Sequence, residues 1–472
     1  MGRESVTRRG FLGGLAAAGS GLVLGACSKT TVGNTSTTST TGARGSSTST
    51  TPTTTPLTTT TTLAVGARPN PAAPAGKDML PQFDHLVVCM LENHSFDNMI
   101  GMAGRGDGLS IGPGGLPTNS NPYPPPGTRR LRSFHMPTPC QTASPSQDWN
   151  ASHTQLDNGT CQGFVTSASG PAAMGYYTDY DMPFTYGLAR TFPVSDRWFC
   201  SVLAQTLPNR RYLLAGTSIG LINDSLLKPL PANGTILDSF NRHGISWKNY
   251  YQNLPSIYCW FGLFGQKAIE SNVVAIDEFY KDCAAGSLPS FSIVDPNFTT
   301  SSEENPQDVQ YGDVFLAKVV NAVMASPKWD RTLLVWTYDE HGGYYDHVPP
   351  PSAPTPDDIP PDLASHDVPG SFDRFGFRVP FGLVSPYAKK DYVSHTICDH
   401  TSILKLCETK WNLPTLTRRD AAANLFLDMV DFDAPPPFRV PPRLPAAANP
   451  ALRASCQSGN TGVIPPPSAI SS

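Results

Sequence analysis

Two short runs of polar residues have the types and spacing needed for metal chemistry. The first run begins with Glu92-Asn93 and ends at Asp97, and the second spans Asp339–His347. Carboxylate and amide oxygens suit a hard divalent cation. The first run alone is explained equally well as a turn, because Asn and Asp side chains satisfy backbone groups in loops. The second run holds three carboxylates and two imidazoles, which favours a metal-assisted hydrolase site over a structural ion-pair cluster.

A third run supplies a hydroxyl group. Thr206 precedes Leu207, Pro208, Asn209 and Arg210. A Thr hydroxyl is a poor nucleophile until a metal or a base activates it. Thr206 would also serve as the N-cap of a helix with Pro208 in its first turn. The two interpretations are compatible, because a helix N-terminus presents N–H groups to a phosphate.

Both acidic runs directly follow apolar runs typical of buried strands of a parallel sheet. The expected strands are His85–Met90, Ile245–Tyr250, Phe291–Val294, Thr332–Tyr338 and Val379–Val384, and the expected helices are Asp308–Ala325 and His400–Trp411. Strands that alternate with helices predict an α/β sandwich with a mostly parallel central sheet. Functional groups gather at the carboxyl ends of such strands, so the two acidic runs predict a site there.

The three runs occur in the same order in a known family. Further matching segments are Phe372-Asp373-Arg374, Arg378-Val379-Pro380, Ser385-Pro386-Tyr387 and His400-Thr401-Ser402-Ile403. Residues 83–433 therefore resemble the bacterial phospholipase C and acid phosphatase family, to which plant non-specific phospholipases C also belong. The resemblance implies an alkaline-phosphatase-like α/β fold with one metal-centred phosphoester site.

The resemblance also implies a ligand set for that metal. It makes Glu92, Asn93, Asp339 and Glu340 metal ligands, and it makes Thr206 both the nucleophile and the fifth ligand. The set implies one divalent ion. Its oxygen ligands favour Ca²⁺, Mg²⁺ or Mn²⁺ over Zn²⁺ because they are hard.

Arg210 and four histidines complete the implied catalytic residues. Arg210 and histidine would stabilise charge or shuttle protons. By position, His153 matches an active-site histidine of the family. His341, His347 and His400 are further candidates, although His347 and His400 also fit as core histidines.

One position departs from the family pattern. The family often has Glu-His-Pro where this chain has Glu304-Asn305-Pro306. Because an amide cannot donate a proton as an acid, Asn305 leaves the leaving-group acid unassigned. His153 or His341 could replace it, or a good leaving group could make an acid unnecessary.

These residues predict a metal-dependent phosphoesterase of the phospholipase C type that works through a phosphothreonine intermediate. Its substrate would be a phospholipid or another phosphoester. An acid phosphomonoesterase on the same site is the close alternative. A surface binding protein that has lost turnover is a third possibility, which the intact ligand set disfavours.

The N-terminal sequence predicts export. Thr7-Arg8-Arg9-Gly10-Phe11-Leu12 precedes an apolar run and resembles a bacterial twin-arginine signal, with a short membrane anchor as the alternative. Leu24-Gly25-Ala26-Cys27 resembles a lipobox, with ordinary cleavage beside an incidental cysteine as the alternative. A lipidated Cys27 would tether the protein to the outer face of the cytoplasmic membrane; without the lipid it would be secreted.

Composition divides the chain into four parts. We expect a signal with lipobox at 1–27, a disordered Thr/Ser/Pro-rich linker at 28–79, a catalytic domain at 80–434, and a Pro-rich C-terminal tail at 435–472 that drapes over that domain. Residues 1–79 carry a charge of +5 against −4 for the whole chain, which leaves −9 for the remainder. That acidic body disfavours a nucleic-acid partner and bulk attraction to anionic membranes.

Ten cysteines also bear on the compartment. If Cys27 carries a lipid, several of the other nine should pair in an oxidising compartment. Cys140 with Cys161 is the predicted pair. Cys89 lies in an apolar strand and is expected to be a buried thiol.

Overall fold

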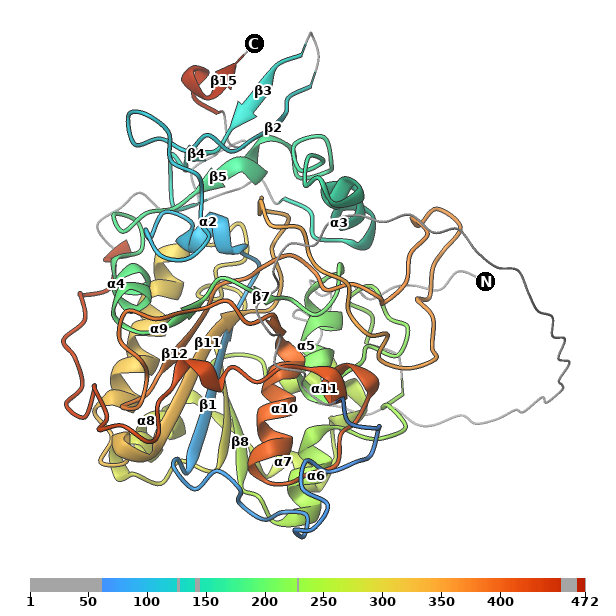
Figure 1. Ribbon diagram of the computed structural model, residues 1–472, viewed down its shortest axis with the longest axis vertical. Helices are drawn as coiled ribbons and strands as arrows, with labels where there is room; N and C mark the ends of the chain where they lie inside the picture. The colour runs from blue at the N-terminus through green and yellow to red at the C-terminus, as the bar shows by residue number, and fades with distance from the viewer. Residues whose placement is uncertain (1–61, 125–127, 141–144, 227–228, 451–464, 472) are drawn as a thin grey trace, which may run out of the picture. The chain divides into compact units, whose positions relative to one another are not determined.

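The computed structural model describes residues 62–471, apart from 125–127, 141–144, 227–228 and 451–464 (Figure 1). The predicted twin-arginine signal, the lipobox cysteine Cys27 and the linker up to residue 61 lie outside the described residues. Among the residues that are described, no helix combines the length and the apolar character needed to cross a bilayer.

An eight-stranded sheet forms the centre of the fold, in the order β13-β6-β12-β11-β1-β10-β8-β9. The strands are β1 (His85–Leu91), β6 (Val194–Ser195), β8 (Trp247–Tyr251), β9 (Val273–Ala275), β10 (Phe291–Asp295), β11 (Thr332–Tyr338), β12 (Phe381–Val384) and β13 (Val393–Ser394). Every strand of this sheet runs in one direction except β12, which is antiparallel to β11 and to β6. The predicted α/β fold with a mostly parallel sheet is confirmed, but the parallel direction expected for Val379–Val384 is wrong.

The two central strands place the acidic runs next to each other. β1 and β11 are parallel and in register from His85 opposite Thr332 to Leu91 opposite Tyr338. All seven residues of β11 are buried, which explains why its sequence is rich in apolar residues. Because both strands end at the same level, Glu92 and Asp339 leave the sheet as neighbours.

Helices cover both faces of the sheet. They are α2 (Phe96–Ile100), α3 (Trp149–Leu156), α4 (Pro183–Thr191), α5 (Thr206–Ala215), α6 (Ile236–His243), α7 (Lys267–Glu270), α8 (Ile276–Ala285), α9 (Val309–Met324), α10 (His400–Lys410) and α11 (Arg418–Ala422). In Figure 1, α4, α8 and α9 gather on one side of the sheet, and α5, α6 and α10 on the other. The helices predicted at Asp308–Ala325 and His400–Trp411 are confirmed as α9 and α10.

Short elements fill the connections. The 3₁₀ helices are η1 (Asp157–Gly159), η2 (Gly170–Met174), η3 (Ser256–Cys259), η4 (Phe261–Leu263), η5 (Trp329–Arg331), η6 (Leu427–Met429) and η8 (Pro467–Ala469). The minor strand pairings join β2 (Ser120–Pro122), β3 (Arg130–Arg132) and β15 (Ile470–Ser471), then β4 (Phe134–His135) with β5 (Gly175–Tyr176), and β7 (Trp198–Phe199) with β14 (Cys398–Asp399).

The described part of the C-terminal segment 435–471 contacts the rest of the folded unit. Strand β15 pairs with β3. The indole N–H of Trp329 donates to the backbone oxygen of Phe438 at 2.9 Å, and the backbone N–H of Ala448 donates to Asp313 at 2.9 Å.

The folded unit begins earlier than the predicted boundary at residue 80. The backbone N–H of Gly66 donates to the oxygen of Thr415 at 3.0 Å, and that of Met79 donates to the oxygen of Lys410 at 2.6 Å. The side-chain amide of Asn412 donates to the oxygens of Asn70 and Ala73, both at 2.9 Å. The compact unit therefore starts at residue 62, and residues 62–79 are not part of a disordered linker.

The cysteine prediction is partly wrong. Cys140 is disulfide-bonded, but Cys161 is a free, buried thiol, so these two residues do not form the predicted pair. The Cys161 side chain packs in the hydrophobic core instead. Cys89 is a buried free thiol, as predicted. The described residues include seven free cysteines, contrary to the expectation that several of them pair.

Candidate active site

The loops after β1 and β11 are bonded directly to each other. The backbone N–H groups of Asn93 and Glu340 both donate to Asp339 Oδ1, at 3.1 and 2.8 Å. The loops approach so closely that a Cβ atom on Gly342 would lie 1.8 Å from the backbone oxygen of Asn93. Gly342 also has φ +65°, so only glycine fits this position without strain.

The hydroxyl of Thr206 points into this junction. Its Oγ1 donates a hydrogen bond to Asn93 Oδ1 at 3.2 Å. Thr206 is the first residue of α5, and Gln205 occupies the N-cap position, so the alternative role of Thr206 as the cap is not observed. The side chain is thus directed at the first acidic run.

Arg210 lies one helical turn after Thr206 and connects three strand ends. Its Nε donates to Asp339 Oδ2 at 2.9 Å, and a terminal nitrogen donates to the backbone oxygen of Leu91 at 3.1 Å. The same terminal nitrogen lies 3.9 Å from Glu92 Oε1, and the second terminal nitrogen lies 3.9 Å from Asp295 Oδ1. The buried Arg210 guanidinium therefore orients the Asp339 carboxylate and lies close to those of Glu92 and Asp295.

The site contains more buried negative than positive charge. Glu92, Asp339 and Glu340 are fully buried, and Arg210 is a cation that contacts Glu92 and Asp339. Burial, with the nearby Asp339 carboxylate, raises the pKa of Glu340 well above its usual value. Glu340 Oε2 accepts the backbone N–H of Gly342 at 2.7 Å, whereas Oε1 is buried with no hydrogen-bond partner. A bound cation would relieve this excess, so the residues fit a divalent metal.

Comparison with known proteins decides the family. The model of the "Phosphoesterase family" matches residues 83–414. The chain belongs to the phosphoesterase family.

This phosphoesterase has relatives among phospholipases C. It is 33% identical over 398 residues to non-specific phospholipase C6 of Arabidopsis thaliana, a match that covers 77% of this chain and 75% of the relative. It is 30% identical over 432 residues to phospholipase C B of Mycobacterium tuberculosis, covering 79% and 81% of the two chains. The protein is therefore a hydrolase of phosphoric ester bonds with phospholipase C-like character.

The solved structures that match this chain are less similar to it in sequence. A protein in the alkaline phosphatase superfamily from Vibrio parahaemolyticus is 15% identical, with a TM-score of 0.35, over 69% of this chain and 76% of that one. The lipoteichoic acid synthase LtaP from Listeria monocytogenes is 11% identical, with a TM-score of 0.36, over 76% and 79%.

His341 lies in the candidate active site, but its surroundings do not suit a proton donor. Its Nε2 is 2.6 Å from Gln155 Oε1, and its Nδ1 is 3.5 Å from Glu340 Oε2. Burial lowers the pKa of the ring to about 3. The ring is therefore neutral near pH 7, which disfavours the predicted role as the replacement acid.

His400 contacts the candidate site through the backbone of Asp339. It is the first residue of α10, and its Nε2 donates to the backbone oxygen of Asp339 at 2.7 Å. Burial lowers the pKa of the ring. This placement matches the alternative interpretation of His400 as a core histidine that fixes the end of β11.

His153 lies on α3, and none of its hydrogen bonds in the described chain reaches Thr206 or the predicted ligands. Its Nδ1 bonds the backbone oxygen of Trp149 at 2.7 Å, and the two rings pack with centroids 4.1 Å apart. Burial lowers the pKa of the ring. The structure records no contact between His153 and Thr206, the predicted nucleophile.

His347 belongs to an ion-pair network instead of the reacting centre. Its Nδ1 lies 2.7 Å from Asp97 Oδ2 and its Nε2 lies 3.2 Å from Asp107 Oδ1, so protein carboxylates engage both nitrogens. Burial alone would lower the pKa of His347, but the hydrogen bond to Asp97 and the charges of Asp97 and Asp346 raise it to about 9. These contacts favour the structural role over the predicted catalytic one.

The same network contains an acidic group that could hold a metal ion. Ligand atoms of Asp97, Asp346 and His347 all lie within 4.8 Å of one another. However, Arg378 already places a guanidinium there, with Nε 2.8 Å from Asp346 Oδ1 and a terminal nitrogen 3.2 Å from Asp97 Oδ1. The arginine supplies the positive charge that a metal would bring, so we assign this group to joining the two acidic runs.

Asn305 contacts Tyr344, a residue of the second acidic run. Its side-chain Nδ2 donates to the Tyr344 hydroxyl at 2.8 Å. The Tyr344 ring stacks on His94 with centroids 4.8 Å apart. The neighbouring Glu304 lies close enough to Glu340 to help raise the pKa of that carboxyl. The position that departs from the family pattern is therefore close to the predicted ligands.

Sequence reasoning missed Asp295 and Gln155. Asp295 is the last residue of β10, and the acidic runs follow the ends of β1 and β11 in the same way. The same strand-end pattern could therefore have revealed Asp295. Gln155 lies on α3 in a segment with no catalytic motif, and no local signal indicates that it meets His341.

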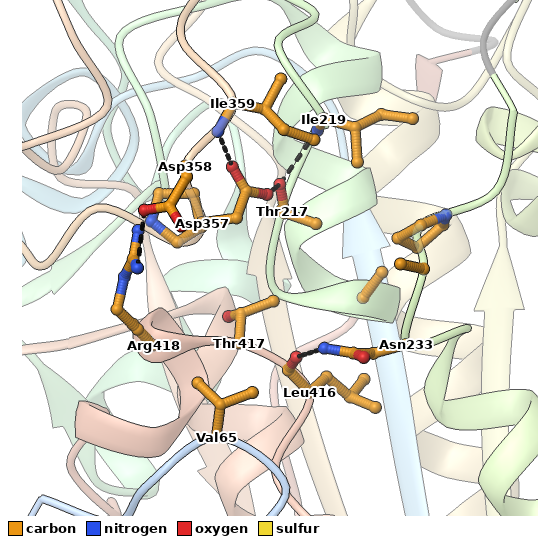
Figure 2. A pocket seen from close by; sticks show the side chains of 14 residues that line it. Val65, Thr217, Ile219, Asn233, Asp357, Asp358, Ile359, Leu416, Thr417 and Arg418 are labelled. Atoms are coloured by element: carbon orange, nitrogen blue, oxygen red, sulfur yellow. Dashed lines mark hydrogen bonds and ion pairs between the residues drawn. The ribbon is translucent and has the colours of Figure 1, made fainter. Parts of the chain in front are cut away.

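A separate pocket of about 210 Å³ lies elsewhere, and none of the predicted site residues line it (Figure 2). Val65, Ile219 and Leu416 contribute apolar walls. Two charged residues of its lining, Arg418 and Asp358, form an ion pair with each other at 2.9 Å. It is distinct from the candidate active site.

Proposed function

We propose that this protein is an exported, lipid-tethered phosphoesterase of the phospholipase C type, which uses one divalent metal ion and forms a phosphothreonine on Thr206. The observation that carries the proposal is the direction of the Thr206 hydroxyl, which lies 3.2 Å from Asn93 Oδ1 beside the acidic strand ends. The names of the phospholipase C relatives support the substrate class.

Five side chains would hold the metal: Glu92, Asn93, Thr206, Asp339 and Glu340. Such an ion lowers the pKa of a bound hydroxyl and stabilises charge on phosphoryl oxygens. The oxygen-only set supports Ca²⁺, Mg²⁺ or Mn²⁺ over Zn²⁺. Arg210 fixes Asp339 through its 2.9 Å bond, and His400 fixes the backbone of the same residue, so the carboxylate needs little reorganisation.

The Thr206 oxygen would attack phosphorus and release the first leaving group. The hydroxyl is at the start of α5, where the positive end of the helix favours an anionic phosphate. Water would then hydrolyse the phosphothreonine. Two in-line displacements predict net retention of configuration at phosphorus.

The substrate that we propose is a phospholipid diester, cleaved to diacylglycerol and a phosphorylated head group. The test compares hydrolysis of phosphatidylcholine with that of a soluble phosphomonoester on one purified sample. Faster turnover of the lipid supports the proposal, whereas turnover of the monoester alone favours the acid phosphatase alternative. Inactivity on both, and on a nitrophenyl phosphate ester with every divalent metal tested, favours a binding protein.

Export and tethering rest on the N-terminal sequence. The twin arginines at Arg8 and Arg9 support the twin-arginine route, and the lipobox ending at Cys27 supports a lipid anchor on the outer face of the cytoplasmic membrane.

A further inference from the structure

The first turn of α5, which carries the proposed nucleophile, already binds a carboxylate of the protein itself. Asp224 Oδ1 accepts the backbone N–H of Leu207, the residue after Thr206, at 2.8 Å. Because Pro208 has no N–H, the first three residues of the helix offer two N–H groups, those of Thr206 and Leu207. Asp224 therefore occupies one of the two positions at which these residues would attract negative charge.

Two further contacts hold the segment around Asp224 against α5. The backbone N–H of Asp224 donates to the side-chain oxygen of Gln205, the N-cap residue of the helix, at 3.1 Å. Arg211, in the same helix, donates to the backbone oxygen of Ser225, the residue after Asp224. The carboxylate of Asp224 is therefore held next to the residue that follows Thr206 before any substrate binds.

A second group beside Thr206 is suited to an anion. Asn93 is only 4% exposed, and its side-chain oxygen accepts the Thr206 hydroxyl at 3.2 Å. Its side-chain nitrogen is buried and has no hydrogen-bond partner among the described residues. A buried donor without an acceptor is costly, and a phosphate oxygen at the Thr206 hydroxyl would satisfy it. The phosphate and the Asp224 carboxylate would then lie close to the same end of α5.

The charge of the substrate determines how strongly Asp224 repels it. Near neutral pH a phosphodiester carries one negative charge, whereas a phosphomonoester carries almost two, because its second pKa is about 6. The Coulomb repulsion between a carboxylate and a phosphate increases with each charge on the phosphate. A carboxylate held beside Thr206 therefore penalises a phosphomonoester more than a phosphodiester.

We propose that Asp224 is a specificity-determining residue that disfavours dianionic phosphomonoesters and so directs the Thr206 site toward monoanionic phosphodiesters. This inference rests on the proposed function, because it takes Thr206 as the group that attacks phosphorus. It gives a physical reason for a choice between the phospholipase C type and the acid phosphatase alternative. An Asn side chain can accept the same Leu207 N–H, so the charge can be removed while the contact is kept.

The test uses two substrates with the same leaving group, nitrophenyl phosphate and its methyl diester, which differ in charge. Asp224→Asn should lower the ratio of kcat/KM for the diester to kcat/KM for the monoester by roughly tenfold or more, because the repulsion of the dianion is removed. Most of this change should be a higher kcat/KM for the monoester. Arg211 keeps its positive charge in this variant, which favours the dianion further.

Three further variants separate the charge of Asp224 from its contact with the helix. Asp224→Ser also removes the charge and should lower the ratio, whereas Asp224→Glu keeps the charge and should keep most of the wild-type preference. Asp313→Asn is the matched control, because Asp313 Oδ1 accepts the backbone N–H of Thr185, in the first turn of α4, at 2.8 Å. This control should change the stability of the protein without changing the ratio.

The outcomes separate this inference from the proposed function. An unchanged ratio in a folded, active Asp224→Asn or Asp224→Ser variant would overturn the role of Asp224 while leaving the phosphoesterase activity intact. A wild type that hydrolyses mainly the monoester, with a ratio that still falls in Asp224→Asn, would support the charge effect of Asp224 and overturn the preference for diesters. If the wild type hydrolyses neither substrate with any divalent metal tested, the proposed function is wrong, and the inference is wrong with it.

Discussion

The hydroxyl of Thr206 donates to the side-chain oxygen of Asn93, a residue that follows a different element and lies 113 positions away in the chain. The two residues meet because the first turn of α5 lies beside the carboxyl end of β1. The contact places a hydroxyl beside the fully buried carboxylates of Glu92 and Asp339. It gives the proposed nucleophile a defined direction before any substrate binds.

Replacement of Thr206 tests this direction. Thr206→Ala should abolish release of nitrophenol from a nitrophenyl phosphate ester, because no oxygen remains to attack phosphorus. It should cost only about 1 kcal/mol of folding stability, since one hydrogen bond is lost and Thr206 is not the helix cap. Thr206→Ser should keep measurable activity, because only the positioning methyl is removed.

A matched control and a stereochemical experiment complete the Thr206 test. Thr185 is also buried near the start of a helix, and its hydroxyl donates to Asp313 at 2.7 Å, so Thr185→Ala should lose stability but keep turnover. A chiral thiophosphate substrate should react with retention at phosphorus. Inversion would mean that water attacks in one step and that Thr206 is no covalent nucleophile.

Asn305 offers a gain-of-function experiment. Asn305→His should raise turnover of substrates with alkoxide leaving groups, which need a proton, and should do little for nitrophenyl esters, which do not. Tyr344→Phe is the control, because it removes one hydrogen-bond partner of Asn305 without adding an acid. Similar effects of Asn305→His on both substrate types would show that position 305 has no part in proton transfer.

The proposed tether depends on Cys27 alone. Cys27→Ala should move the protein from the membrane fraction to the soluble fraction of cells, because no thiol remains to carry the lipid. Replacement of the adjacent Ser28 by Ala should leave the distribution unchanged. Immunoblots of the separated fractions give the readout, and a Cys27→Ala protein that stays with membranes would contradict the lipobox prediction.

The sequence predicts the core of this fold better than its edges. The runs that became β1, β8, β10, β11 and β12 were visible because they are rich in β-branched and aromatic residues. The direction of β12 was not predictable, since an apolar run is the same pattern in either direction. Strands β6 and β13 have two residues each, and their pairing depends on neighbours far away in the chain.

The site shows the same limit. Glu92 and Asp339 could be found because each directly follows a strand, and parallel strands bring their ends together. The sequence could not distinguish the role of Asp339 from that of Asp346, because both residues lie in one nine-residue run. Asp346 pairs with Arg378, 32 residues further along, and only the folded chain shows that contact.

The last prediction concerns the pH dependence contributed by His347. Its contacts with Asp97 and Asp107 are ion pairs only while the ring is protonated. The pKa is about 9 in the folded protein, above the ordinary value of 6.5, so folding favours the protonated ring. The resulting stabilisation is fully present below pH 6.5 and is lost as the pH rises through 9.

His347→Gln should therefore lower the free energy of unfolding most at pH 6, by at most about 3 kcal/mol, and progressively less toward pH 9.5. Urea unfolding of the wild type and the variant at several pH values measures the difference. His366→Gln is the control, because the His366 side chain is 78% exposed and its nearest carboxylate oxygen, on Asp367, is 3.7 Å away. This control should show a small difference at every pH. A His347→Gln difference that stays constant from pH 6 to 9.5 would mean that the ring contributes by packing, and that its charge does not hold the two acidic runs together.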